Sequence, residues 1–188
     1  LLLMAGLAVL ALTWADLGET ARSTTASFRD QVREYPELFA SRRFWGYCLS
    51  ATFASGAFFA FIGGAPFVGT DVFGLNSVQV GFAVGAPALG YFTGNFISGR
   101  YSVRKGVNWM ITVGAMISTL GMIIPFVLAL AGISTALSFF GSVTLVGLGN
   151  GMLMPNANAG MLSVRPHLAG SASGIGGAIM IFGGACLS

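Results

Sequence analysis

Residues 15–43, ADLGETARSTTASFRDQVREYPELFASRR, hold ten of the fifteen Asp, Glu, Lys and Arg residues in this chain of 188 residues. So many charges in a short run are better solvated by water than buried, so this stretch should be exposed. The sequence on both sides of it is almost free of charge. We therefore interpret residues 15–43 as an exposed linker and place the other segments relative to it.

The composition of the whole chain is typical of a protein that crosses the membrane several times. Hydrophobic residues make up 55% of the chain and charged residues only 8%, and the mean hydropathy is +0.81. Soluble domains carry about 25% charged residues. The net charge of +3 does not indicate a nucleic-acid partner, because the nine basic residues are spread over three short segments. The predicted fold is an all-α polytopic membrane protein in a lipid bilayer.

Charge-free windows define the expected membrane helices, because a span needs about 20 mainly apolar residues and a central charge costs roughly 3 kcal/mol. Residues 1–14 are expected to be the end of one helix, so that the chain starts within a longer protein. A secretory signal at this place would lack the basic segment that normally precedes its apolar core. A carboxy-terminal half of five helices is expected after the linker, at about residues 44–69, 79–99, 107–129, 135–158 and 168–188.

The basic residues all lie in alternate connecting segments. The linker holds five of them, residues 100–105 hold three, and Arg165 is the ninth. The loops around 71–79 and 131–134 hold none. Because basic residues are retained on the cytoplasmic side of membrane proteins, we expect the three basic segments to be cytoplasmic.

Part of the linker has apolar residues at helical spacing. They are Phe28, Val32, Tyr35 and Phe39, with Pro36 placed to start a new turn. This pattern fits an amphipathic helix on the cytoplasmic face of the membrane, and equally a solvated linker with scattered apolar residues.

Glycine pairs and prolines recur within the expected helices. Glycines four residues apart lie on one helix face and allow a neighbouring helix to approach closely. These pairs are Gly81/Gly85, Gly90/Gly94, Gly147/Gly151 and Gly170/Gly174. Each proline removes one backbone hydrogen bond and is expected to bend or loosen its helix. These prolines are Pro66, Pro87, Pro125 and Pro155. Interrupted helices of this kind suit a protein that changes shape.

No arrangement of residues indicates an enzyme, a metal site or a cofactor. The chain has one His, its two Cys residues are isolated, and no acidic residue lies within an expected helix. A hydrolase or a metal centre needs several such groups together. We therefore predict no enzymatic activity and no bound cofactor or metal.

Polar and aromatic side chains of the helices are the candidates for substrate binding. Ser138, Ser142, Gly149 and Asn156 fall within about 40° of one another around a helix. This narrow stripe would either hydrogen-bond a substrate in a cavity or contact a neighbouring helix. The predicted substrate-binding residues are Phe58, Phe61, Tyr91, Ser142, Asn150 and Asn156.

Three short motifs follow one another along the chain. The first is GAPFV at residues 64–68, followed by FGL at 73–75, and the second is GLGNG at 147–151, followed by PNA at 155–157. The third is PHLAGSASG at 166–174. In this order they resemble the seventh, tenth and eleventh helices of the Bcr/CflA drug-resistance transporters of the major facilitator superfamily. The residues that carry the resemblance most directly are Pro66, Pro155, Pro166, His167 and Gly170.

The resemblance implies a transporter of two six-helix halves, of which this chain holds the end of helix 6 and helices 7–11. It also implies proton-driven export of hydrophobic drugs by alternating access, in the inner membrane of a bacterium. The coupling acid would lie in the missing amino-terminal half, because no helix here contains an acid. The basic loop motif of the superfamily, with a conformational or gating role, would fall on Arg100, Arg104, Lys105 and Gly106. The acidic residue that often belongs to this motif is absent.

Two other functions stay open at the level of the sequence. A transporter of one specific polar solute would usually need a charged or densely polar site, which these helices lack. A membrane receptor or assembly factor that transports nothing is the other possibility. Inverted-repeat similarity between this chain and preceding helices would argue against a receptor.

Overall fold

The computed structural model describes residues 2–16 and 35–188. The chain divides into two units, residues 1–33 and 34–188, which are described separately. The first unit contains α1 (Leu2–Asp16), an apolar helix in which the hydroxyl of Thr13 donates to the carbonyl of Val9. The predicted amphipathic helix of the linker lies mostly outside the described residues, and only its last part, residues 35–39, is seen to be helical.

The second unit consists of helices joined by short turns. α3 (Arg42–Phe67) continues into the π-helical segment η1 (Val68–Val72), and α4 (Ser77–Lys105) and α5 (Val107–Leu130) follow. α6 (Ala136–Val164) leads through the 3₁₀ segment η2 (Pro166–Leu168) into α7 (Ala169–Cys186). Among the described residues, five helices are long and apolar enough to cross a membrane. The prediction of an all-α polytopic membrane protein is confirmed.

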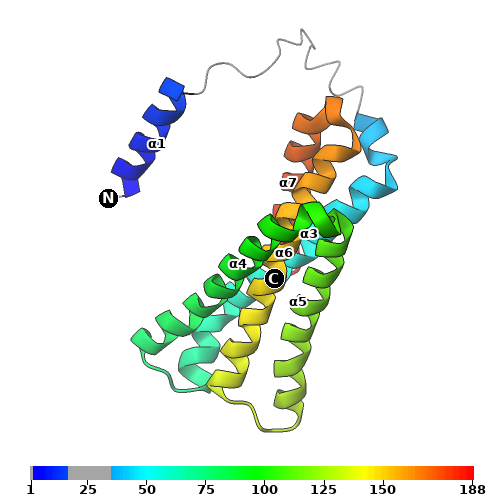
Figure 1. The fold of residues 1–188 in the computed structure, drawn as a ribbon. Coiled ribbons are helices and arrows are strands. Elements are labelled where there is room, and N and C mark those ends of the chain that lie inside the picture. The colour runs from blue at the N-terminus through cyan, green and yellow to red at the C-terminus, as the bar shows by residue number, and fades with distance from the viewer. Residues whose placement is uncertain (1, 17–34) are drawn as a thin grey trace. The chain divides into compact units, whose positions relative to one another are not determined.

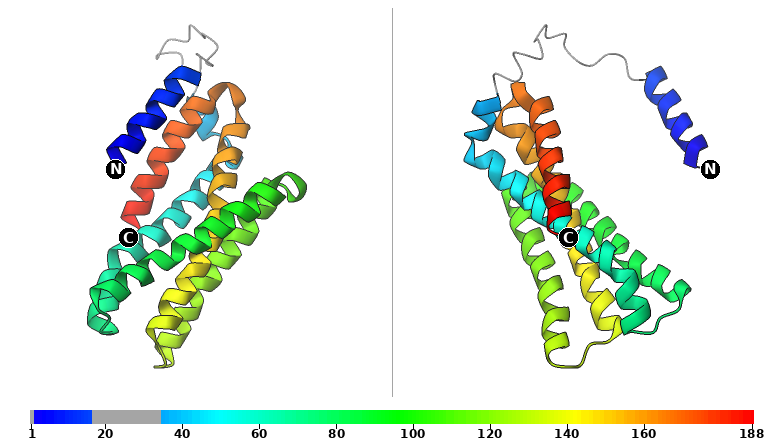
Figure 2. Two further views of the ribbon diagram at one scale, coloured as in Figure 1. Left: turned by 60° about the vertical axis from the view of Figure 1, so that its left-hand side comes forward. Right: turned by 180° about the vertical axis from the view of Figure 1, so that it is seen from behind.

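Helix α6 is the centre of the second unit. Its largest contacts are with α4 and α5, and it also packs against α3 and α7. Figures 1 and 2 show α6 running along both α4 and α5, while α7 runs beside α3. Fourteen residues of α6 are buried, against four each on α4 and α5. Within the described unit, α6 therefore supplies more of the core than any other helix, and α4 and α5 turn most of their surface outward.

Two of the predicted glycine pairs lie in the contact between α4 and α6. They are Gly90/Gly94 on α4 and Gly147/Gly151 on α6. A Cβ atom added at any of the four would collide with a backbone carbonyl of the opposite helix. The predicted close approach is thus confirmed for these pairs. The pairs Gly81/Gly85 and Gly170/Gly174 have no described neighbour within 4 Å of an added Cβ.

The contact between α5 and α6 uses glycine in the same way. A Cβ atom at Gly114 would lie 2.6 Å from the carbonyl oxygen of Gly149, and one at Gly121 would lie 2.8 Å from that of Ser142. Close backbone contact of this kind increases dispersion attraction between helices, which is the main attraction available where lipid is as apolar as the helices.

The carboxyl end of α4 differs from the prediction. The loop expected over residues 99–106 is instead helical as far as Lys105, so Arg100 and Arg104 lie in the last turns of α4. The helix stops at Gly106, whose φ of 87° is readily adopted only by glycine. Hydropathy marks the part of a helix that lies in lipid, whereas the helix itself continues into water until a residue stops it. Basic side chains near its carboxyl end also interact favourably with the helix dipole.

Reciprocal capping side chains define two of the helix starts. At the start of α4, Asn76 Oδ1 accepts from the backbone N–H of Gln79 (2.9 Å), and Gln79 Oε1 accepts from that of Asn76 (3.0 Å). Thr135 and Ser138 make the same exchange at the start of α6. These bonds satisfy N–H groups that a helix start otherwise leaves unpaired.

The residues just before α3 are part of the second unit. Leu38 is completely buried in a cluster that includes Phe44 of α3, Leu168 of η2 and Ala172 of α7. The backbone carbonyl of Phe39 accepts a hydrogen bond of 2.8 Å from the indole of Trp45. The segment at the end of the predicted linker is therefore anchored where α6 turns into α7.

An ion pair makes a further connection at this place. Glu37 Oε1 lies 2.6 Å from Nε of Arg165, and Glu37 Oε2 lies 3.8 Å from Nε2 of His167. All three side chains are about half exposed, so water and salt screen their attraction.

Replacement of this carboxylate should have only a small effect on stability. Glu37→Gln is expected to lower the free energy of unfolding by no more than about 1 kcal/mol, because exposed ion pairs contribute little. The measurement is the thermal unfolding midpoint of the purified full-length protein in detergent, at low and high salt. Asp71→Asn serves as the control, since Asp71 is exposed and has no ion pair among the described residues. A loss several times larger than this limit would show that the pair is a principal anchor.

Candidate functional site

A pocket of about 360 Å³ lies between α3, α4, α6 and α7. We call it the α4-side pocket. Aromatic, methionine and small side chains make up most of its wall, and its lining residues are Ser55, Phe58, Phe59, Val84, Pro87, Ala88, Tyr91, Gly147, Asn150, Met154 and Met180. None of these side chains carries a charge. The pocket is therefore suited to an apolar or aromatic molecule that makes few hydrogen bonds.

On α4 and α6, residues one helical turn apart both line this pocket. Phe58 and Phe59 come from the middle of α3, and Tyr91 follows Pro87 by one turn on α4. Met154 follows Asn150 by one turn on α6. Aromatic rings supply large flat contact areas, and the flexible thioether of methionine adapts to ligands of different shape.

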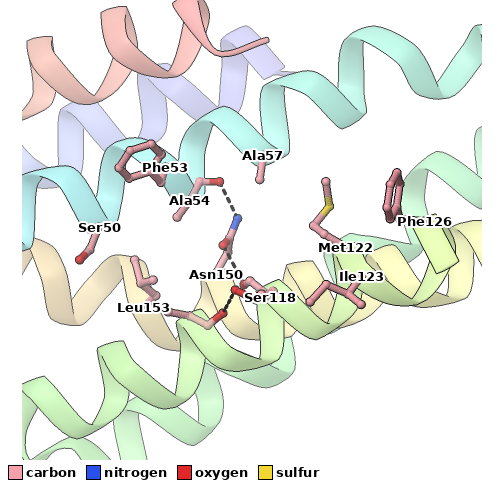
Figure 3. A pocket seen from close by; sticks show the side chains of 12 residues that line it. Ser50, Phe53, Ala54, Ala57, Ser118, Met122, Ile123, Phe126, Asn150 and Leu153 are labelled. Carbon is pink, nitrogen blue, oxygen red and sulfur yellow. Dashed lines mark hydrogen bonds between the residues drawn. The ribbon is translucent and has the colours of Figure 1, made fainter.

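Asn150 is the polar centre of this region. Its side chain is only 4% exposed. Nδ2 donates to the carbonyl of Ala54 on α3 at 3.0 Å, and Oδ1 accepts from the hydroxyl of Ser118 on α5 at 3.2 Å. Figure 3 shows this amide reaching from α6 towards both helices. One amide side chain thus joins three helices.

The hydrogen bonds of Asn150 leave part of its capacity unused. A primary amide has two N–H donors and an oxygen that accepts twice. Among the described residues, one donor is occupied by Ala54 and one acceptor position by Ser118. The second N–H and the second lone pair have no partner among the described residues.

A second cavity lies on the other side of Asn150. This open groove of about 640 Å³ runs between α3 and α5 and has α6 as its floor; we call it the α5-side groove. Figure 3 shows the groove with most of its side chains labelled. Its lining residues are Ser50, Phe53, Ala54, Ala57, Ala115, Ser118, Thr119, Met122, Ile123, Phe126, Asn150 and Leu153.

Three of the predicted substrate-binding residues come together in the α4-side pocket. These are Phe58, Tyr91 and Asn150. Phe58 and Tyr91 are 38% and 44% exposed. The structure thus groups an amide with two aromatic rings from three different helices.

The other three predicted residues make contacts between protein groups. Phe61 is buried with its ring centroid 6.2 Å from that of Phe140. Ser142 donates to the carbonyl of Ser138 within its own helix. Neither side chain lines the α4-side pocket or the α5-side groove.

Asn156 also bonds to protein groups. Its Nδ2 donates to the hydroxyl of Ser98 on α4 and to the carbonyl of Met152, both at 2.7 Å. Gly149 lies against α5. Two residues of the predicted polar stripe, Asn156 and Gly149, therefore contact the neighbouring helices α4 and α5.

The five motif residues that carry the resemblance most directly line neither the α4-side pocket nor the α5-side groove. Pro66 is in the last turn of α3, and Pro155 is inside α6. Pro166 and His167 form η2, and Gly170 is in the first turn of α7. Arg100, Arg104 and Lys105 are exposed at the end of α4, where Lys105 Nζ lies 5.6 Å from the ring centre of Trp109.

The lining residues that sequence reasoning did not identify include Ser118, Met154 and Met180. The spacing of four between Asn150 and Met154 places both on one face of α6 and is a usable signal. Ser118 and Met180 lie on other helices, and no local spacing connects them to Asn150.

The chain was compared with known proteins. The family model described as "Major Facilitator Superfamily" matches residues 1–188. A protein of Bacillus subtilis (strain 168), named "Uncharacterized MFS-type transporter YdgK", is 26% identical over 166 residues. That match covers 87% of this chain and 40% of the relative, so the chain spans about two-fifths of the length of the relative it matches. No solved structure matches the chain significantly.

Proposed function

The chain belongs to the Major Facilitator Superfamily, and from this premise we propose that the full-length protein transports small hydrophobic molecules, which bind partly in the α4-side pocket. One observation carries the proposal. The pocket combines three aromatic rings and two methionines with a single buried amide that retains hydrogen-bonding capacity. This combination favours apolar and aromatic compounds over densely polar solutes.

The absence of charge from the lining supports the same substrate class. A polar solute such as a sugar or an amino acid would lose its hydration in the pocket and find few groups to replace it. An aromatic compound loses little hydration and gains contact with Phe58, Tyr91 and the methionine side chains. Asn150 would orient a ligand through its free N–H or its free lone pair.

We further propose export by alternating access, coupled to protons, as in the Bcr/CflA transporters that the three motifs resemble. The only acidic residue between α3 and the end of the chain is Asp71, and it is exposed in η1 at a helix end. A coupling carboxylate must be reachable from both sides of the membrane in turn and normally has a protected position within the spans. The proposal therefore places the coupling acid in an amino-terminal half that precedes this chain.

The test of the substrate site is a matched pair of substitutions on α4. Tyr91→Ala is expected to raise the half-saturating concentration of a fluorescent lipophilic dye about fivefold, because it removes one aromatic contact of about 1 kcal/mol. The measurement is dye accumulation in cells with and without the full-length protein, at several dye concentrations and with a protonophore as a second arm.

Phe92→Ala is the control for this substitution. Phe92 neighbours Tyr91, is 74% exposed and does not line the pocket. It should leave dye accumulation unchanged. Equal effects of the two substitutions would contradict the assignment of the pocket. Accumulation that is the same with and without the protein, across a broad panel of lipophilic dyes, would contradict hydrophobic-compound export itself.

A further inference from the structure

Ser55 is a polar residue of the α4-side pocket to which the proposed function assigns no role. It lies in the middle of α3, is only 6% exposed, and lines the pocket together with Phe58 and Phe59 of the same helix. Its hydroxyl makes no hydrogen bond with any residue that the structure describes. Because a buried polar group without a partner costs free energy, most such groups are paired, and an unpaired one in a pocket calls for a ligand.

The other buried hydroxyl groups of this unit have partners. Thr52, three residues before Ser55 on α3, donates to the carbonyl of Cys48 at 2.9 Å. Ser142 makes the same bond to the preceding turn of α6, and the hydroxyl of Ser98 accepts from an amide. Such bonds to the preceding turn use the hydroxyl proton of a serine or threonine within its own helix. Ser55 lacks this bond, so its proton is free to donate elsewhere.

Ser55 is buried by the helices that the structure describes. On the side of α7, a Cβ atom added at Gly184 would lie 3.2 Å from Cβ of Ser55. The hydroxyl is nevertheless not sealed inside the protein, and the residue lines the α4-side pocket. A partner for this hydroxyl can therefore approach through the pocket.

The hydroxyl lies beside the polar centre of the pocket. Figure 3 shows the amide of Asn150 bonded to the carbonyl of Ala54, the residue that precedes Ser55 on α3. Ser55 and Asn150 both line the pocket, whose other lining residues are apolar apart from the phenol of Tyr91. Two hydrogen-bonding groups thus come together between α3 and α6, in a lining made mostly of aromatic, methionine and small side chains.

We propose that Ser55 contacts the ligand and gives the pocket a preference for aromatic compounds that carry a hydrogen-bond acceptor. The hydroxyl donates to this acceptor, while Phe58 and Tyr91 contact the aromatic part of the compound. The inference rests on the proposed substrate site and narrows its substrate class. A compound with an acceptor gains a bond in the pocket, whereas a hydrocarbon of the same shape leaves the hydroxyl unpaired.

The test compares phenanthridine with phenanthrene, which have the same shape and differ by a ring nitrogen that accepts a hydrogen bond. Each is titrated into the purified full-length protein in detergent, and its apparent dissociation constant is obtained from the rise in the thermal unfolding midpoint. Ser55→Ala is expected to raise the constant for phenanthridine about fivefold, the equivalent of one net hydrogen bond, and to leave that for phenanthrene unchanged. Because each variant is compared with the parent for the same compound, unequal partition of the two compounds into detergent cancels.

Ser142→Ala is the matched control. Ser142 is a buried serine of α6 that donates within its own helix and lines neither the α4-side pocket nor the α5-side groove. Its replacement should leave both dissociation constants unchanged. The ligand-free midpoint gives a second readout: Ser55→Ala should not lower it, because the substitution removes no hydrogen bond between described residues.

Equal changes in the two constants on Ser55→Ala, or no change in either, would overturn the proposal. A lowered ligand-free midpoint would do so too, because the hydroxyl would then have a partner within the full-length protein, such as a side chain of the amino-terminal half. Binding of neither compound by the parent would overturn the substrate class together with this inference. A selective loss of phenanthridine affinity would support the role of Ser55 even if the protein exported no lipophilic dye, so a failure of the export proposal is seen separately.

Discussion

Gly94→Leu is expected to lower the free energy of unfolding by about 3 kcal/mol or more, and to reduce sharply the yield of folded protein. A Cβ atom at Gly94 would collide with the carbonyl of Leu148 and lie 3.0 Å from the Cα of Gly151 and from the backbone N of Met152. These are backbone atoms of α6, which cannot move aside as a side chain would. Overpacking in a closed contact costs about 1–3 kcal/mol even when side chains yield, so a rigid neighbour should bring the cost to the top of that range or beyond.

The matched control for this substitution lies on the same helix. Gly85→Leu introduces the same side chain on α4 at a position with no described neighbour within 4 Å. Its midpoint should equal or slightly exceed that of the parent, because leucine favours the helix more than glycine does. The measurements are fluorescence-detected size-exclusion chromatography and the thermal unfolding midpoint of the full-length protein. Comparable losses in both variants would show that glycine at 94 is not required for the packing of α4 on α6.

Asn150→Ala is expected to lower the free energy of unfolding by about 1–2 kcal/mol. The substitution removes the hydrogen bonds to Ala54 and Ser118 and with them the polar connection between α3, α5 and α6. Hydrogen bonds between helices in membranes contribute about 0.6 kcal/mol on average and at most about 2 kcal/mol each. Because Asn150 also lines the α4-side pocket, dye export should decline more than the loss of stability explains.

A double-mutant cycle measures how much the hydrogen bond between Ser118 and Asn150 contributes to stability. Ser118→Ala combined with Asn150→Ala should show a stability coupling of about 0.6 kcal/mol, since the two side chains share one hydrogen bond. Asn158→Ala is the control, because Asn158 is an exposed asparagine on the same helix. Additive effects of the two substitutions would mean that the bond between Ser118 and Asn150 contributes nothing. Normal export by a stable Asn150→Ala protein would remove Asn150 from the substrate site.

The candidate site was predicted only in part from the sequence. Phe58, Tyr91 and Asn150 were named and lie together in the α4-side pocket, whereas Met154 and Met180 line the same pocket and were not named. Pockets between helices are formed by residues far apart in the sequence, so periodicity within one helix identifies a face and not what that face meets. The polar stripe of α6 illustrates this limit: its periodicity was compatible with a cavity or a helix contact, and Asn156 and Gly149 face α4 and α5.

The sequence alone was sufficient for the membrane class and for the approximate places of five long apolar helices, because the cost of burying charge in lipid leaves long windows free of Asp, Glu, Lys and Arg. It did not show where the charged end of α4 would stop, since a helix continues beyond the lipid until a residue such as Gly106 ends it. Nor could it identify α6 as the central helix or choose between four glycine pairs of equal spacing. Lipid and protein interior are similarly apolar, so hydropathy does not distinguish a face that packs from one that meets lipid. Only the tertiary structure decides this, by bringing the backbone of α6 against Gly90 and Gly94 and leaving Gly81 and Gly85 open.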